Sequence, residues 1–120
     1  MGLGANLAAN LGRRVTDLRE RLGHRIDEVA AEAGLSRSGL WYIEHGRINT
    51  KIDVLERLVV VLGVDAADLF TFPWTRYPRH RARDLIRLTP ENQIDGLVAA
   101  MEEYLQRQEV LVMRSKKHRK

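Results

Sequence analysis

Apolar residues recur every three or four positions along the first 70 residues, which is the spacing of short helices that bury one face. The longest stripes run from Leu7 to Leu22 and from Ile52 to Leu62. A glycine follows each of the first four stripes, as is common where a helix ends: Gly23, Gly34, Gly46 and Gly63. No convincing alternation of apolar and polar residues marks a strand. The pattern predicts five short helices over residues 1–70.

Small polar residues stand where three of these helices are expected to begin. Their side-chain oxygens can accept hydrogen bonds from the free N–H groups of a first helical turn. Ser36 is predicted to cap a third helix that turns Leu40 and Ile43 inward. Asn49 is predicted to cap the fourth helix and Asp65 the fifth.

The residue pattern changes after residue 70. Residues 71–88 are aromatic, basic and interrupted by proline, which indicates a linker, with helical potential over 79–88. Thr89–Pro90–Glu91 has the residue types of a helix start, with Thr89 as N-cap. We expect an amphipathic helix over 89–113 and a basic disordered tail over 114–120. The apolar positions of this helix include Ile94, Leu97, Val98, Met101 and Leu105.

Charge is distributed unevenly along the chain. There are 20 Lys and Arg against 16 Asp and Glu, a net charge of +4. Residues 1–70 carry 9 basic and 10 acidic groups, 71–88 carry 5 and 1, 89–113 carry 1 and 5, and 114–120 carry 5 and none. The basic charge of the linker and the tail is expected to attract phosphate without regard to sequence.

Several classes of function are excluded by what the sequence lacks. Without cysteine there is no disulfide, no thiol catalysis and no Cys-ligated zinc. The four histidines have no metal-ligand spacing, and no glycine loop could cradle phosphate, so we expect no metal, no cofactor and no enzyme. The longest apolar run, Leu58 to Leu62, is too short to cross a bilayer, and the first residues do not form a signal peptide. We expect a soluble, cytoplasmic protein of the bacterial nucleoid with no membrane partner.

Residues 25–46 combine a short helix, the turn Gly34–Leu35–Ser36 and a helix ending in Ile43–Glu44–His45–Gly46. This arrangement resembles the helix-turn-helix of the Cro/phage-repressor family, also called the XRE family. Matching positions continue on both sides, so that the resemblance covers about residues 10–70: Leu18–Arg19–Glu20, Gly23, Asn49, Ile52, Leu55, Leu58, Leu62–Gly63–Val64 and Asp68–Leu69. The resemblance implies an all-α, five-helix lambda-repressor-like DNA-binding domain over residues 1–70, followed by the C-terminal amphipathic helix.

The resemblance also implies roles for individual residues. Arg37, Ser38 and Tyr42 match the base-reading positions of the family, and Arg37 could bond bidentately to guanine. Residues that match positions contacting phosphate are Ser36, His45, Arg47 and Asn49. Arg19 and Glu44 match an ion pair that holds the third helix against the first, and we interpret this pair as structural.

Two positions depart from the pattern of the family. Ile26 stands where a phosphate-clamping Gln is common, and Arg25 beside it is a candidate replacement. Trp41 stands at an outward position that is usually small and polar, and we count it among the base-reading residues. It could pack on a thymine methyl group, fill a contact between domains or block ordinary readout.

The sequence therefore predicts a sequence-specific transcriptional regulator that binds double-stranded DNA. The stripe over 89–113 has no evident partner, which favours a homodimer, although folding back on the first domain is the alternative. Two other functions remain open. One is the DNA-binding antitoxin of a toxin–antitoxin pair, with the C-terminal segment contacting a protein partner. The other is an adaptor that uses Trp41 and Tyr42 to bind protein.

Overall fold

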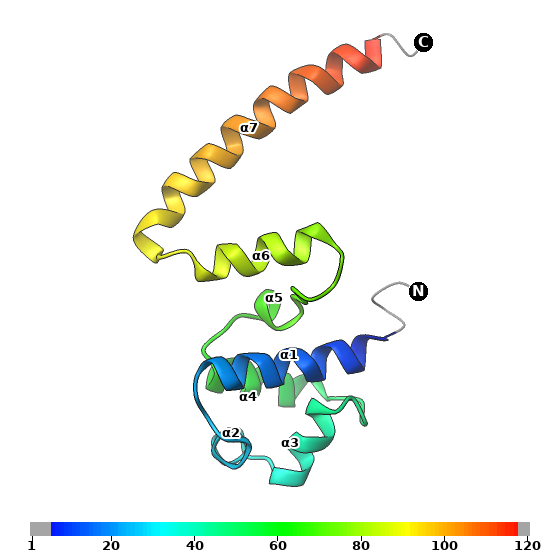
Figure 1. Cartoon of the computed structure of the whole chain (residues 1–120), viewed down its shortest axis with the longest axis vertical. Helices are drawn as coiled ribbons and strands as arrows, with labels where there is room; N and C mark the ends of the chain where they lie inside the picture. The colour runs from blue at the N-terminus through cyan, green and yellow to red at the C-terminus, as the bar shows by residue number, and fades with distance from the viewer. Residues whose placement is uncertain (1–5, 118–120) are drawn as a thin grey trace. The chain divides into compact units, whose positions relative to one another are not determined.

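The computed structural model describes the backbone of residues 6–117 and the side chains of residues 6–109. Every regular element in this part of the chain is a helix (Figure 1), so the predicted all-α class is confirmed. The helices are α1 (Leu7–Arg21), α2 (Ile26–Glu32), α3 (Arg37–Glu44), α4 (Ile52–Leu62), α5 (Ala66–Leu69), α6 (Pro78–Leu88) and α7 (Glu91–Lys117). The chain forms two compact units, Met1–Asp84 and Leu85–Lys120, so that α6 passes from the first unit into the second.

Two of the three predicted caps are present in the first unit. The Ser36 hydroxyl accepts a hydrogen bond from the Gly39 N–H at 2.9 Å, and the Asp65 carboxylate accepts one from the Asp68 N–H at 2.7 Å. The prediction for Asn49 is wrong. Lys51 precedes α4 with an extended backbone (φ −71°, ψ 152°), so Asn49 lies two residues before the cap position.

The core of the first unit is apolar and is shared among the first five helices. Its buried members are Leu11, Val15, Leu18, Val29, Ala30, Ala33, Leu40, Ile43, Leu58, Leu62 and Leu69. Helix α1 packs closely on the C-terminal end of α3, because a Cβ atom at Gly12 would overlap the backbone carbonyl groups of Ile43 and Glu44. Any side chain at Gly12 would therefore force α1 and α3 apart.

The second unit consists of the end of α6 and the long helix α7. Helix α7 begins at Glu91, and Thr89 does not cap it. The Thr89 hydroxyl instead donates to the Leu85 carbonyl in the last turn of α6, at 2.9 Å. The helix extends to Lys117, into the segment expected to be a disordered tail. Residues 118–120 of that tail, and the side chains of residues 114–117, lie outside the described part of the chain.

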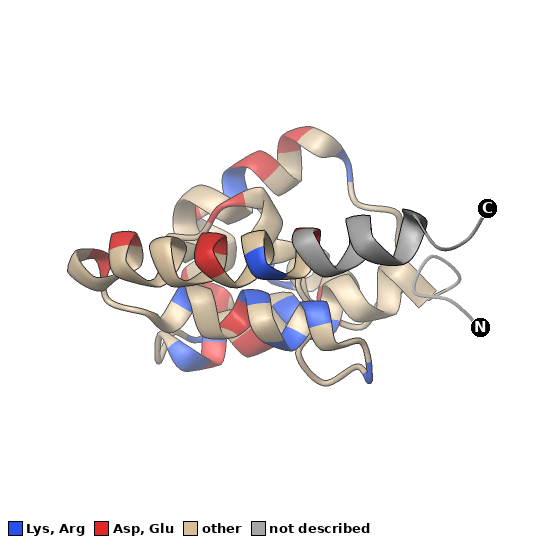
Figure 2. Cartoon of the chain, turned by 90° about the horizontal axis from the view of Figure 1, so that it is seen from above, with Lys and Arg blue, Asp and Glu red and all other residues tan. Residues whose placement is uncertain are grey.

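The described side chains of α7 leave a stripe of apolar groups in contact with solvent. Val98 and Met101 are each 38% exposed, and Tyr104 and Leu105 are more exposed still. Ile94 and Leu97 on the same stripe are half-buried. Acidic residues outnumber basic ones along this part of the helix (Figure 2).

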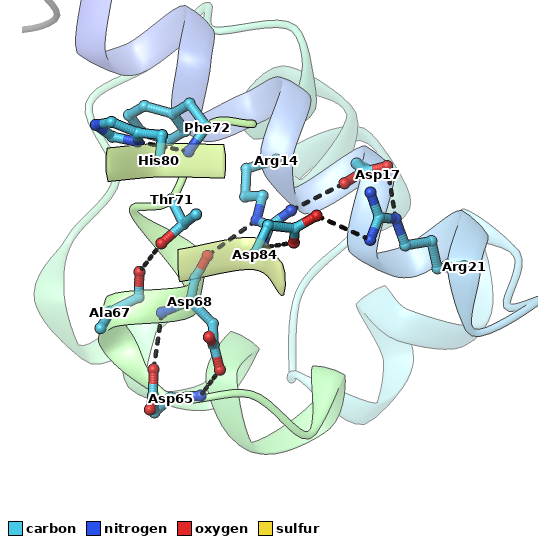
Figure 3. A network of polar contacts seen from close by, with 10 residues as sticks. All are labelled: Arg14, Asp17, Arg21, Asp65, Ala67, Asp68, Thr71, Phe72, His80 and Asp84. Atoms are coloured by element: carbon cyan, nitrogen blue, oxygen red, sulfur yellow. Dashed lines mark hydrogen bonds and ion pairs between the residues drawn. The ribbon is translucent and has the colours of Figure 1, made fainter. Parts of the chain in front are cut away.

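Arg14 of α1 is completely buried in a network of polar contacts (Figure 3). Its guanidinium donates to the Asp68 carbonyl at 2.9 Å, to the Asp17 carboxylate at 3.0 Å and to the Asp84 carboxylate at 3.0 Å. Arg21 joins the network through Asp17 at 3.1 Å and Asp84 at 3.5 Å. The side of α1 that carries Arg14 is thus bound to the backbone of α5 and to the Asp84 carboxylate of α6.

Residues 71–84, predicted as part of a linker, belong to the first compact unit. Phe72 is buried, and the indole N–H of Trp74 donates to the Asn10 side-chain oxygen at 3.0 Å. The Arg13 guanidinium lies 4.4 Å from the centre of the Trp74 ring, within the range of a cation–π contact. The proline-punctuated segment is therefore ordered, because its aromatic rings find partners on the polar side of α1.

Because the side chain of His80 in α6 is buried, we expect the protein to lose stability in acid. Its Nδ1 accepts a hydrogen bond from the Phe72 N–H at 2.8 Å, so this nitrogen must be unprotonated. Burial, assisted by the positive charge of Arg83, lowers the pKa of His80 below its ordinary value of 6.5. The unfolded chain then takes up the proton first, so this contribution to stability is complete above pH 6.5 and is lost as the pH falls towards the lowered pKa.

Urea unfolding between pH 7.5 and pH 5 tests this expectation on the wild type and on His80→Phe. The variant keeps an aromatic ring beside Phe72 but has no group to titrate. We expect it to be less stable at pH 7.5 because it leaves the Phe72 N–H without its acceptor. We also expect its difference from the wild type to shrink as the pH falls. A constant difference would show that His80 does not titrate in this range.

Candidate nucleic-acid interface

Helices α2 and α3 are joined by a tight turn that fixes the direction of α3. Gly34 adopts a positive φ of 69°, which a residue with a side chain rarely adopts. The Leu35 N–H then donates to the Ala30 carbonyl at 2.8 Å and closes the end of α2. Leu40 and Ile43 turn into the core, as predicted, so the opposite side of α3 faces outward.

The four residues predicted to read bases lie together on this outward side. Arg37, Ser38, Trp41 and Tyr42 are all exposed and line one shallow hollow. Their spacing along α3 places Trp41 one helical turn after Arg37, and Tyr42 one turn after Ser38. One helix therefore lines this hollow with a guanidinium, two hydroxyl groups and an indole.

The hydrogen bond that caps α3 explains why a glycine, Gly39, lies inside this helix. Gly39 is unfavourable there by about 1 kcal/mol relative to alanine. A Cβ atom at Gly39 would lie 2.9 Å from the Ser36 hydroxyl oxygen, which is the acceptor of the cap. Glycine leaves room for that hydrogen bond, and an N-cap contributes about 1 kcal/mol. Ser36 itself remains exposed at the N-terminal end of α3.

The ring of Trp41 is supported by His45. The two rings stack with their centres 3.8 Å apart and their planes at 19°, and Trp41 keeps 42% of its surface exposed. His45 Nδ1 lies 2.8 Å from the Trp41 carbonyl oxygen. Because a carbonyl only accepts, Nδ1 carries a proton in this contact. His45, predicted to contact phosphate, therefore also positions Trp41.

The side chains of Arg19 and Glu44 lie together in a bidentate ion pair. The Arg19 Nε and Nη2 atoms donate to the two carboxylate oxygens at 2.8 Å and 3.0 Å, and Nη1 donates to the His24 carbonyl at 3.0 Å. Hydrogen bonding to Glu44 raises the pKa of Arg19, so its charge is permanent. The Glu44 side chain is almost completely buried. The pair fixes the last turn of α3 against α1.

The remaining residues predicted to contact phosphate, Arg25, Arg47 and Asn49, are exposed. Arg25 precedes α2, and its Nε atom lies 3.3 Å from the Asp27 carboxylate and 3.4 Å from that of Glu28. Arg47 and Asn49 stand in the segment between α3 and α4. Since Asn49 does not cap α4, no cap bond occupies its side chain.

The basic charge of residues 71–84 lies on another side of α1 from α3. Gly12, which contacts α3, and Arg14, which contacts Asp84, point about 160° apart around α1. The exposed arginines of this segment are Arg76, Arg79, Arg81 and Arg83. A DNA duplex bound against α3 would therefore contact the N-terminal end of α3 and the segment that follows α3. These arginines would lie farther from the duplex.

Sequence reasoning missed two residues of α1, of which Gly12 positions the candidate interface and Arg14 holds α5 and α6. Gly12 sets the distance between α1 and α3, and the available signal was a glycine inside a helical pattern. Arg14 is completely buried, and nothing in its local sequence pattern signals this. Among residues 6–109, no group of acidic or histidine side chains is placed to hold a metal ion. No helix within the described residues is both long and apolar enough to cross a membrane.

Comparison with known proteins gives a family match and a structural match. A family model described as a helix-turn-helix domain matches residues 10–70. The crystal structure of the restriction-modification controller protein C.AhdI from Aeromonas hydrophila is similar, with a TM-score of 0.51 and 26% sequence identity. That similarity covers 52% of this chain and 94% of the controller protein. No curated protein sequence matches significantly.

Proposed function

The chain belongs to the helix-turn-helix domain family and is a DNA-binding transcription regulator, and we propose that it binds a two-half-site operator as a homodimer. The observation that carries the proposal is the outward side of α3, where Arg37, Ser38, Trp41 and Tyr42 stand exposed around one hollow. A helix that presents such side chains can enter a major groove about 12 Å wide. The similarity to a restriction-modification controller supports a role in regulation.

Within this proposal, α3 is the reading helix and the groups around it hold phosphate. Arg37 pairs its guanidinium with the O6 and N7 acceptors of a guanine. Ser36 lies at the N-terminal end of α3, where the helix dipole and free N–H groups favour an anion. Arg47 and Asn49 follow α3 and contact the backbone on the other side of the groove. The Arg19–Glu44 pair keeps α3 in one orientation while these contacts form.

We assign dimerisation to the apolar stripe of α7. The side chains of the stripe are exposed or half-buried within the second unit, and a second copy would remove them from water. The proposed interface residues are Ile94, Leu97, Val98, Met101 and Leu105. Regulators of this kind bind half-sites about 34 Å apart, and a symmetric pair presents two reading helices at such a spacing.

Replacing Arg37 with alanine tests the reading role. We expect a loss of about 1–3 kcal/mol of discrimination at one base pair, with weak binding to random duplexes nearly unchanged. The matched control is Arg47→Ala, which should weaken binding to specific and random duplexes equally and lower the salt slope by about 0.9. Titration of a selected operator and of random duplexes at several salt concentrations measures both effects.

Three results, two from this titration and one from purification of the protein, would contradict parts of the proposal. An equal loss on specific and random duplexes in Arg37→Ala would make Arg37 a phosphate contact. The absence of any salt-dependent DNA affinity in the wild type would favour an adaptor that binds protein through Trp41 and Tyr42. Co-purification of a small toxin bound to the C-terminal segment would favour the antitoxin.

A further inference from the structure

Trp41 places an apolar ring on the reading helix where bases are expected, and we propose that it reads the 5-methyl group of a pyrimidine in the major groove. The inference rests on the proposed function, because it needs α3 to enter that groove. It goes beyond that function by naming the chemical group that Trp41 recognises. The methyl group of thymine and that of 5-methylcytosine both occupy this place on the base edge.

The first support is that the ring of Trp41 is held before any ligand arrives. His45 stacks on it at 3.8 Å and is itself anchored through Nδ1 to the Trp41 carbonyl oxygen at 2.8 Å. Tyr42 meets the indole edge to face, with the ring centres 5.4 Å apart and the planes at 86°. A side chain that is already ordered loses little conformational entropy on binding, which favours contact with a group as small as a methyl.

The second support is the chemistry of the hollow around the ring. Arg37, Ser38 and Tyr42 supply its polar groups, and these suit the acceptors and donors of a base pair. Trp41 supplies apolar surface, with 42% of the residue exposed. An indole has one donor and no acceptor, so it cannot make a bidentate contact with a base. The apolar feature of the major groove is the pyrimidine C5-methyl group, which is therefore the complementary partner for Trp41.

The spacing of α3 also limits where the methyl group can be. Trp41 lies four residues, about 6 Å, from Arg37 along the helix axis. Successive bases of one strand are about 3.4 Å apart. The methyl group read by Trp41 should thus belong to a base within about two base pairs of the guanine read by Arg37.

Exchange of single thymines for deoxyuridine in a selected operator tests the proposal. Deoxyuridine keeps every hydrogen-bonding group of thymine and lacks only the methyl group. We expect one exchange, within about two base pairs of the Arg37-dependent guanine, to weaken wild-type binding about four-fold, the ratio for burial of one carbon. Trp41→Ala should bind the thymine and deoxyuridine duplexes equally, whereas Tyr42→Phe, the control, should keep the four-fold ratio.

A second pair of duplexes separates the two sources of the methyl group. At the sensitive position the thymine is replaced by cytosine or by 5-methylcytosine, each paired with guanine. Tighter binding of the methylated duplex, lost in Trp41→Ala, would mean that the methyl group is read whichever base carries it. If the deoxyuridine exchange weakens binding but methylation of cytosine has no effect, Trp41 reads thymine only. Both results support the proposal, and thermal unfolding of each variant verifies that the first unit stays folded.

The failures of the two proposals give different results. If no duplex is preferred over random DNA, the proposed function fails. If an operator is bound selectively but no deoxyuridine exchange weakens binding, only the role of Trp41 fails. An effect of the exchange that persists in Trp41→Ala would assign the methyl contact to another residue and overturn the inference. Tighter operator binding by Trp41→Ala would show that the ring obstructs readout.

Discussion

Substituting Arg14 with methionine is expected to lower the free energy of unfolding by about 3–5 kcal/mol. Arg14 is fully buried, and its guanidinium joins Asp17, the Asp68 carbonyl and Asp84 at 2.9–3.0 Å. Methionine would replace much of the side-chain volume but none of the three hydrogen bonds. The Asp84 side chain, only 10% exposed, would then keep its charge in a nearly dry place without this guanidinium.

Arg21→Met is the matched control for this prediction. Arg21 lies on the same helix and meets the same two carboxylates, at 3.1 Å and 3.5 Å, but its side chain is 40% exposed. Water screens an ion pair at such a place, so we expect a loss of no more than about 1 kcal/mol. Urea unfolding followed by tryptophan fluorescence measures both variants. Equal losses would mean that the buried position of Arg14 contributes nothing beyond an ordinary surface pair.

Helix α3 was predictable from sequence because its signals are local. Ser36 stands three residues before the N–H that it accepts, and Leu40 and Ile43 have the spacing of a buried helical stripe. The exposure of Arg37 and Trp41 follows from the same periodicity. The Arg19–Glu44 pair joins residues 25 positions apart, and it was found only because the chain resembles a family in which these positions pair.

The attachment of residues 71–84 was not predictable, because its signals are distant. Asp84 is 70 positions from Arg14, and Trp74 is 64 positions from Asn10. Proline and aromatic residues in such a segment indicate a linker when they are considered alone. The polar side of α1 supplies their partners, and a hydrophobic pattern does not reveal that a charged residue such as Arg14 is buried.

Helix α1 therefore holds two parts of the first unit in place, α3 on one side and α5 with α6 on another. On one side Gly12 and Arg19 hold the C-terminal end of α3, where the reading surface ends. On another side Arg14 holds the backbone of α5 and, through Asp84, helix α6. Loss of Arg14 should therefore lower stability without altering any residue of the outward side of α3.

Replacing both Leu97 and Met101 with aspartate is expected to convert the protein into a folded monomer. The two residues lie one turn apart on the apolar stripe of α7, and an interface there would have to remove two carboxylates from water. Affinity for an operator with two half-sites should fall by about 10²–10⁴-fold, because the second half-site is no longer bound by a linked partner. Affinity for a single half-site should change little.

The control for charge is Ala99→Asp with Gln106→Asp, which adds the same two charges about 150° away on the opposite side of α7. This control should remain dimeric and keep its affinity for the full operator. Light scattering gives the mass of each variant. Both tryptophans of the chain, Trp41 and Trp74, lie in the first unit, so their fluorescence reports its folding independently of α7. A dimer that survives Leu97→Asp with Met101→Asp would place the interface elsewhere, and equal dissociation of both variants would mean that charge alone, rather than burial of the stripe, controls association.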